Sequence, residues 1–184
     1  MAFRGVSNSD GDLRYATISA GLEDLDAALN YIKTLSWVES LALCGNSYGG
    51  QLAIMEASKN PSKYKFLILL SPGVGFSFIP NLDAEKWRCD GFAKILGFDM
   101  HYSMYVDICK NADITLAKNI NIPTLIVHGD NDEILPLENS IQLSELIKSA
   151  KLVVLKDCLH QYAPCGKLID ALTAVNNFIR DQNE

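Results

Sequence analysis

Hydrophobic positions along the chain follow two spacings, one typical of amphipathic helices and one typical of buried strands. Over residues 17–35, leucine and isoleucine recur every three or four positions with charged residues between them, which predicts a helix. Residues 138–149 and 167–180 show the same amphipathic pattern, and residues 48–59 form an apolar, small-residue segment closed by an Asn-Pro pair. We expect a helix in each of these four segments.

Four continuous apolar runs alternate with these helices, as expected for strands that are buried on both faces. They occupy residues 38–45, 64–72, 121–130 and 150–157. This alternation predicts an α/β fold, with a mostly parallel sheet that carries helices on both faces. We expect residues 1–184 to form a single domain, because the chain has no repeat, low-complexity tract or linker.

Residues 73–119 interrupt the alternation, because this stretch is irregular and longer than a simple crossover needs. We interpret it as a small cap of short helices inserted over one end of the sheet. Its aromatic side chains could line an apolar pocket or could form the core of the cap itself. These residues are Phe76, Phe78, Trp87, Phe92, Phe98, Tyr102 and Tyr105.

Composition limits which partners the protein could bind and in which cellular compartment it is expected. The net charge is −6, and an acidic chain disfavours binding to a phosphate backbone, so we expect no nucleic acid partner. The longest apolar runs are too short for a membrane span, and the first twelve residues lack the apolar core of a signal peptide. The five cysteines show no zinc spacing and favour a reducing compartment, which predicts a cytoplasmic protein. Cys44 lies in an apolar run and is expected to be buried.

The stretch LALCGNSYGGQLAIM, residues 41–55, places Ser47 between an apolar strand and a helix. A sharp strand-to-helix turn would project the hydroxyl clear of the backbone, and Gly45 and Gly49 fit such a turn because larger side chains would clash there. The backbone N–H of Tyr48 would then lie at the positive end of the helix, where it can stabilise an oxyanion. The alternative is a tight glycine turn with an incidental serine.

A serine nucleophile needs a base, and the chain has three histidines. His160 follows the last predicted strand, which places it at the same edge of a parallel sheet as Ser47. His128 lies at the end of the strand 121–130 and is interpreted as a packed strand-end residue. His101 lies in the predicted cap and is interpreted as a surface or packing residue.

The base needs an orienting carboxylate, and the loop HGDNDEILP offers three: Asp130, Asp132 and Glu133. With Asp132 as the acid, the chain order is Ser47, Asp132, His160. This serine–acid–histidine order is the one expected of a large hydrolase fold.

Together these motifs resemble the α/β-hydrolase superfamily. LALCGNSYGG resembles its nucleophile elbow, IPTLIVHGDNDEILP its acid loop, LKDCLHQY its histidine loop, and FRGVSNSDGD the arginine–glycine–serine loop that precedes the elbow. The closest variety is the short-cap serine esterases, thioesterases and serine-aminopeptidase-like hydrolases. In that family the catalytic aspartate is the fourth residue counting from the glycine of the His-Gly pair. This implies Asp132, and we expect Asp130 to stabilise the turn.

The resemblance also implies a departure, because the family has further strands before the arginine–glycine loop, whereas this sequence begins at Met1, close to that loop. We therefore expect an N-terminally truncated α/β-hydrolase core that lacks a second oxyanion donor. The strand at residues 38–45 would then be an open apolar edge, through which the chain could form a homo-oligomer.

The expected function is that of a serine hydrolase acting on a small-molecule carboxylic ester, thioester or amide. Its catalytic residues would be Ser47, His160 and Asp132, with the Tyr48 N–H at the oxyanion and no metal or organic cofactor. The alternative is a catalytically impaired, truncated hydrolase-like protein that acts as an interaction module or is a relic. The intact triad residue types argue against this alternative, and the missing strands argue for it.

Overall fold

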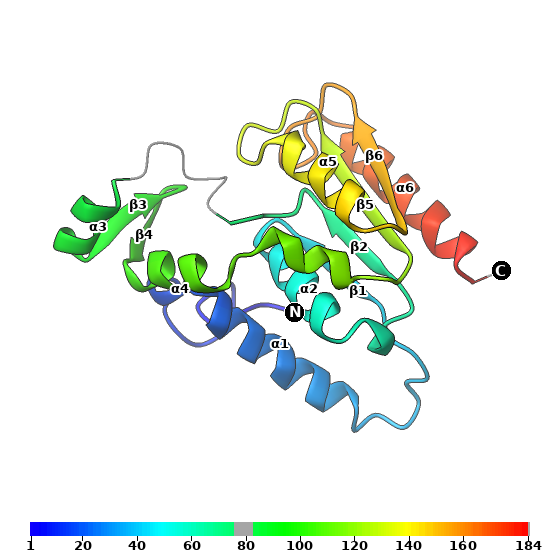
Figure 1. Cartoon of the computed structure of the whole chain (residues 1–184), viewed down its shortest axis with the longest axis horizontal. Helices are drawn as coiled ribbons and strands as arrows, with labels where there is room; N and C mark the ends of the chain where they lie inside the picture. Colours follow the sequence, from blue (N-terminus) through cyan, green and yellow to red (C-terminus); the bar gives the residue numbers. More distant parts are fainter. Residues whose placement is uncertain (76–82, 184) are drawn as a thin grey trace. The chain divides into compact units, whose positions relative to one another are not determined.

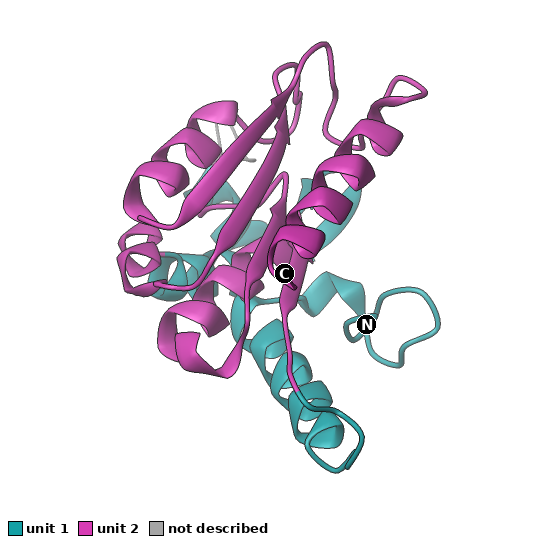
Figure 2. Cartoon of the chain, turned by 90° about the vertical axis from the view of Figure 1, so that its right-hand side faces the viewer, with its two compact units in different colours: residues 1–39, 79–112 teal, residues 40–78, 113–184 magenta. Residues whose placement is uncertain are grey.

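The computed structural model describes residues 1–75 and 83–183, which divide into two compact units. Residues 1–39 and 79–112 form unit 1, and residues 40–78 and 113–184 form unit 2 (Figure 2). The predicted cap, residues 73–119, therefore contributes to both units, and the single-domain expectation stays a prediction.

Unit 2 contains a parallel sheet of four strands in the order β1-β2-β5-β6 (Figure 1). The strands are β1 (Leu43–Asn46), β2 (Leu67–Leu70), β5 (Thr124–Gly129) and β6 (Ala150–Leu155). All three pairings are parallel, and the register aligns Leu43 with Leu67 and Leu67 with Thr124. Each strand lies within one of the four apolar runs or one residue beyond it, so the predicted α/β class with a mostly parallel sheet is confirmed.

The three helices predicted for this part of the chain are present. They are α2 (Tyr48–Lys59), α5 (Leu137–Leu146) and α6 (Lys167–Asp181). Two short 3-10 helices complete the unit: η2 (Pro61–Lys63) and η3 (Ile114–Asn119). Helix α2 packs on β1 and β2, while α5 and α6 both pack on β5 and β6.

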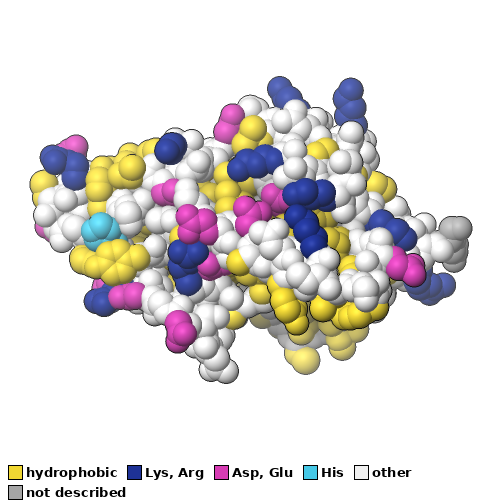
Figure 3. Space-filling model, turned by 90° about the horizontal axis from the view of Figure 1, so that it is seen from below, with side chains coloured by type: hydrophobic (Ala, Val, Ile, Leu, Met, Phe, Trp, Pro, Cys, Tyr) yellow, Lys and Arg dark blue, Asp and Glu magenta, His cyan; other side chains and the backbone are white. Residues whose placement is uncertain are grey.

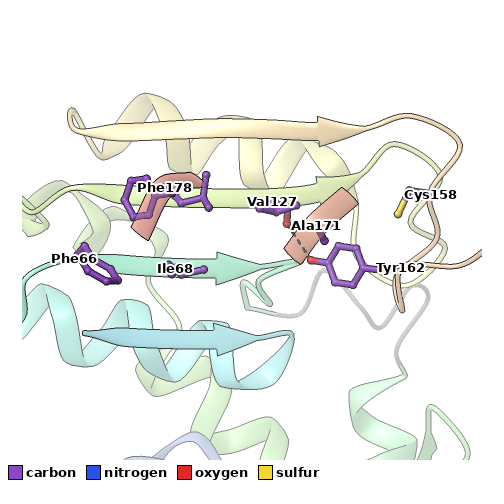
Figure 4. Close-up of a cluster of buried hydrophobic side chains, with 8 residues drawn as sticks. Phe66, Ile68, Val127, Cys158, Tyr162, Ala171 and Phe178 are labelled. Carbon is purple, nitrogen blue, oxygen red and sulfur yellow. Dashed lines mark hydrogen bonds between the residues drawn. The ribbon is translucent and has the colours of Figure 1, made fainter. Parts of the chain in front are cut away.

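Alternate residues of the strands face the two sides of the sheet. His128 contacts Ser140 of α5, so the even-numbered residues of β5 face the α5 side. On the other side, Leu125 and Val127 join a buried cluster with Phe178 of α6 (Figure 4). The helices thus cover both faces, and burial of apolar surface on each face holds the layers together.

Strand β1 is at one edge of this sheet, and it is shorter than the predicted strand at residues 38–45. The sequence predicts a buried Cys44, and this is wrong because the side chain is exposed. The physical reason is that α2 covers one face of β1, whereas α6 packs on β5 and β6 and leaves the face that carries Cys44 open. Self-association through this edge stays a prediction.

Unit 1 contains the predicted helix at residues 17–35 as α1 (Ile18–Ile32), with the Thr17 hydroxyl accepting a hydrogen bond from the Ala20 N–H as N-cap. Its other elements are η1 (Leu13–Tyr15), α3 (Ala84–Asp90), β3 (Phe92–Ile95), β4 (Phe98–His101) and α4 (Ser103–Asn111). The antiparallel pair of β3 and β4 departs from the all-helical cap that the sequence predicts. Helix α1 also packs on α4, where the Ser19 N–H donates to Asp107 at 3.0 Å.

One aromatic residue of the predicted cap lies in the core of unit 1, and two more pack against it. Trp87 is 1% exposed, its indole N–H donates to the Met100 carbonyl at 2.8 Å, and its ring contacts those of Tyr102 and Tyr105. Phe92 and Phe98 are exposed. Phe76 and Phe78 lie outside the described residues. Among the described aromatic residues of the predicted cap, only Phe92 and Phe98 remain candidates for lining an apolar pocket.

The surface carries charges of both signs. On the face drawn in Figure 3, lysine and arginine side chains are interspersed with aspartate and glutamate side chains. Within residues 1–75 and 83–183, no helix combines the length and the apolar character that crossing a membrane would require.

The sheet core yields a stability prediction. Leu69 of β2 is fully buried, so Leu69→Ala should lower the free energy of unfolding by about 2–5 kcal/mol through lost burial and a residual cavity. Leu172→Ala removes the same atoms from a position on α6 that is 50% exposed, and it should change stability by about 0.5 kcal/mol or less. Urea unfolding of the two variants and the parent measures the difference, and equal losses would contradict the assigned core.

Candidate active site

Ser47 lies at the sharp turn between β1 and α2, with φ 51° and ψ −118°. A non-glycine residue adopts such angles only under constraint from its surroundings. The constraint is close packing: a Cβ on Gly45 would lie 2.3 Å from the Gly49 carbonyl oxygen, and one on Gly50 would lie 2.8 Å from Pro72. The predicted strained elbow is therefore present. Of the two glycines that the sequence assigns to it, Gly45 has no room for a side chain, the role of Gly49 stays a prediction, and Gly50 is a further position without such room.

Backbone hydrogen bonds fix the elbow to the neighbouring strand end. The Ser47 N–H donates to the Leu70 carbonyl at 2.9 Å, and the Ser47 carbonyl accepts from the Gly73 N–H at 2.8 Å. Tyr48 is the first residue of α2, so its N–H belongs to the positive end of the helix dipole.

His160 lies in the loop after β6 and connects Ser47 to Asp132. Its Nε2 is 3.0 Å from the Ser47 Oγ, and its Nδ1 is 2.7 Å from the Asp132 Oδ2. A carboxylate only accepts hydrogen bonds, so the proton belongs on Nδ1 and leaves Nε2 free to accept from the serine hydroxyl. The structure thus brings the three predicted residues together in one chain of hydrogen bonds.

The Asp132 carboxylate is fully buried, with four hydrogen-bond donors around it. Its Oδ1 accepts from the N–H groups of Ile134 at 3.0 Å and Leu135 at 2.8 Å. Its Oδ2 lies 2.7 Å from His160 Nδ1 and 3.1 Å from His128 Nε2. Burial acts to raise the pKa of Asp132, but the hydrogen bonds from these four groups together hold that pKa well below its usual range.

The acid loop and the histidine loop are joined by three further hydrogen bonds. Glu133 accepts from the backbone N–H of His160 at 3.1 Å, and Asp130 accepts from that of Cys158 at 3.3 Å. The Asn131 N–H in turn donates to the Cys158 carbonyl at 3.1 Å. Asp130 therefore holds the neighbouring loop, whereas the sequence suggests a role in its own turn. Contacts of this kind join segments far apart in sequence, and no motif signals them.

Tyr162 also supports the site, and the sequence motifs did not indicate it. Its hydroxyl donates to the Val127 carbonyl at 3.2 Å and lies 3.3 Å from the Ser71 Oγ, which fixes the histidine loop to the end of β5 (Figure 4). Burial raises the pKa of Tyr162 to about 12, so the hydroxyl stays a donor at neutral pH. A tyrosine two residues after a candidate base was the available signal.

The other two histidines lie where the sequence suggests. His101 packs in unit 1 between the rings of Tyr15 and Phe92. His128 is fully buried at the end of β5, as expected of a packed residue, and it also contacts Asp132. In the part of the chain that the structure describes, no group of three or more His, Cys, Asp or Glu side chains could hold a metal ion.

The prolyl oligopeptidase family matches residues 12–159, which is most of the chain and includes Ser47 and Asp132. The chain belongs to the prolyl oligopeptidase family. Its parallel sheet, with helices on both faces, is the α/β-hydrolase fold, and together with the family match this confirms the superfamily that the sequence motifs suggest.

Three similar proteins illustrate this relationship. A 2-hydroxymuconate semialdehyde hydrolase from Pseudomonas sp. (strain CF600) is 28% identical over 173 residues, covering 74% of this chain and 60% of the relative. Est1E from Butyrivibrio proteoclasticus, solved with ferulic acid bound, is 25% identical with a TM-score of 0.83, covering 98% of this chain and 75% of that one.

The third protein is the mouse alpha/beta hydrolase domain-containing protein 10. It is 20% identical with a TM-score of 0.80, and the match covers 97% of this chain and 74% of that one. Compared with the Pseudomonas hydrolase, this prolyl oligopeptidase family member spans less than two thirds of the relative's length.

The low pKa of Asp132 predicts how stability depends on pH. Because the folded-state pKa lies below the ordinary value of 3.8, ionised Asp132 stabilises the fold above that value, and this contribution is lost as the pH falls below about 4. Asp132→Asn should therefore flatten the dependence of the free energy of unfolding on pH in the acid range. Asp130→Asn removes a carboxylate from the same loop and is the control. Urea unfolding at a series of pH values measures both, and equal acid-range slopes for parent and Asp132→Asn would contradict the prediction.

Proposed function

We propose that this protein is a serine hydrolase that cleaves a small-molecule carboxylic ester, thioester or amide. The observation that carries the proposal is the pair of hydrogen bonds from Ser47 Oγ to His160 Nε2, at 3.0 Å, and from His160 Nδ1 to Asp132 Oδ2, at 2.7 Å. A serine at a strained elbow, a base within reach of its proton and a buried acid behind the base are the parts that acyl transfer requires.

The first half of the proposed reaction forms an acyl-enzyme. Ser47 Oγ attacks the substrate carbonyl carbon while its proton moves to His160 Nε2. Asp132 holds the imidazole in the required tautomer and stabilises the imidazolium that forms. The Tyr48 N–H at the start of α2 donates to the oxyanion of the tetrahedral intermediate.

The second half releases the acyl group. His160 passes its proton to the leaving alcohol, thiol or amine as the tetrahedral intermediate collapses. A water molecule then gives a proton to His160 Nε2 and attacks the acyl-enzyme, and collapse of this intermediate returns the proton to Ser47. No step requires a metal or an organic cofactor.

The comparisons support a hydrolytic reaction on a small substrate. The Pseudomonas relative is named a hydrolase, and Est1E binds ferulic acid, an aromatic carboxylic acid. Membership of the prolyl oligopeptidase family adds an amide bond to the candidates. Rates on p-nitrophenyl esters of rising acyl length, a feruloyl ester and a set of aminoacyl amides would identify the substrate class.

The nucleophile can be tested by covalent labelling. Ser47→Ala should abolish labelling by a fluorophosphonate probe and lower kcat by several orders of magnitude, and His160→Ala should lower kcat to a similar extent because the residues act as a unit. Circular dichroism checks that each variant is folded. Labelling of Ser47→Ala at the parent rate would overturn the assignment, and an unlabelled parent would favour the catalytically impaired interaction module.

The acid can be tested against its neighbour in the same loop. Asp132→Asn should lower kcat by about 10⁴-fold, because it favours the wrong histidine tautomer. Asp130→Asn should have a much smaller effect on kcat, felt mainly in stability, since the Asp130 carboxylate accepts from the backbone N–H of Cys158 and not from the His160 ring. Steady-state ester hydrolysis measures both variants, and the reverse order of effects would assign the acid role to Asp130.

A further inference from the structure

His128 contacts the acid of the proposed triad from the side opposite to its base. The side chains of His128 and Asp132 are both fully buried, and the His128 Nε2 lies 3.1 Å from the Asp132 Oδ2. That same oxygen is 2.7 Å from the His160 Nδ1. One carboxylate oxygen is therefore shared by two imidazole rings.

The surroundings of His128 determine which of its nitrogens carries a proton. Nε2 must carry the proton, because it makes a hydrogen bond to the Leu135 carbonyl at 3.1 Å. The Asp132 Oδ2 lies at the same distance from Nε2, so the two oxygens share that proton. Nδ1 lies 2.7 Å from the Oγ of Ser140, a buried residue of α5. The Ser140 hydroxyl can donate to Nδ1, which fixes the ring as the Nε2–H tautomer.

The direction of the Asp132 carboxylate depends on this donor. Oδ1 accepts from the backbone N–H groups of Ile134 and Leu135, and the remaining torsional freedom of the side chain is rotation about its Cβ–Cγ bond, which would move Oδ2 away from His160. A second donor on Oδ2 opposes that rotation and keeps Oδ2 at hydrogen-bond distance from His160. A small misplacement of a catalytic group is costly, because the transition state requires its geometry.

We infer that His128 is a positioning residue, whose Nε2–H is shared between the Leu135 carbonyl and the Asp132 carboxylate and so holds the acid loop and the carboxylate in the orientation that His160 requires. The expected effect on turnover rests on the proposed function, whereas the hydrogen bonds can be observed without it. His128 acts through Asp132 and has no contact with Ser47 in this arrangement.

Three variants separate this role from packing. His128→Leu removes the donor and keeps an apolar side chain, while His128→Gln retains an N–H donor at the end of a side chain of similar reach. Ser140→Ala removes the partner that fixes the tautomer and leaves the ring in place. Ser144→Ala is the matched control, because Ser144 lies one turn further along α5 and donates to the Ile141 carbonyl.

Turnover is measured per active site titrated with the fluorophosphonate probe, so that unfolded protein does not count. His128→Leu should lower kcat by about 10- to 10²-fold with KM nearly unchanged, and His128→Gln should restore most of that loss. Ser140→Ala should lower kcat in the same direction but less, and Ser144→Ala should match the parent. Parent-like kcat per titrated site in His128→Leu would overturn the inference and leave His128 a packing residue.

Nuclear magnetic resonance of ¹⁵N-histidine-labelled protein observes the positioning directly. The chain has only three histidines, so His160→Ala assigns the hydrogen-bonded Nδ1–H signal of His160. That signal should be sharp and downfield in the parent and His128→Gln, and broadened by exchange in His128→Leu. An inactive parent that shows this pattern would contradict the proposed function alone, while an unchanged signal in His128→Leu would contradict the inference alone.

Discussion

The buried carboxylate of Asp132 is the group on which the arrangement of the site depends. Removing an ionised carboxylate from water costs several kcal/mol unless hydrogen bonds replace the lost hydration. Here the replacement comes from two amides of its own loop, from His128 at the end of β5 and from His160 in the loop after β6. Because these donors belong to different segments, the charge is satisfied only when the strands and their loops are all in place.

The elbow at Ser47 depends on a second constraint, the close packing of β1 and α2. A Cβ on Gly45 would meet Gly49 of α2, and one on Gly50 would meet Pro72, beyond the end of β2. This close packing around the elbow holds the serine at a positive φ. Ser71 and Asp157 also have positive φ values, of 39° and 51°, and both lie just beyond strands of the same sheet. Strained backbone of this kind persists where surrounding packing over-determines it, and it concentrates at functional sites.

The loops that carry the acid and the base behave as one structural piece. Asp130 and Glu133 accept from the backbone of the histidine loop, and Tyr162 ties the same loop to the Val127 carbonyl. These contacts restrict His160 before any substrate arrives, which reduces the reorganisation that catalysis would otherwise require. In unit 1, by contrast, Tyr102 and Tyr105 pack on each other and on Trp87, which is buried in that unit's own core.

The sequence by itself determined the α/β class, the order of the main helices and strands, and the identity of the three residues that the structure connects by hydrogen bonds, Ser47, His160 and Asp132. Periodicity and glycine spacing report local requirements, and parallel strands bring their carboxyl ends to one edge, so these features follow from the chain alone. Only the tertiary structure decided the rest: the hairpin of β3 and β4, the exposure of Cys44, and the contact of His128 with Asp132. Each of these features depends on which segment packs beside another, because the hydrophobic pattern of a segment does not specify which neighbour covers a given face.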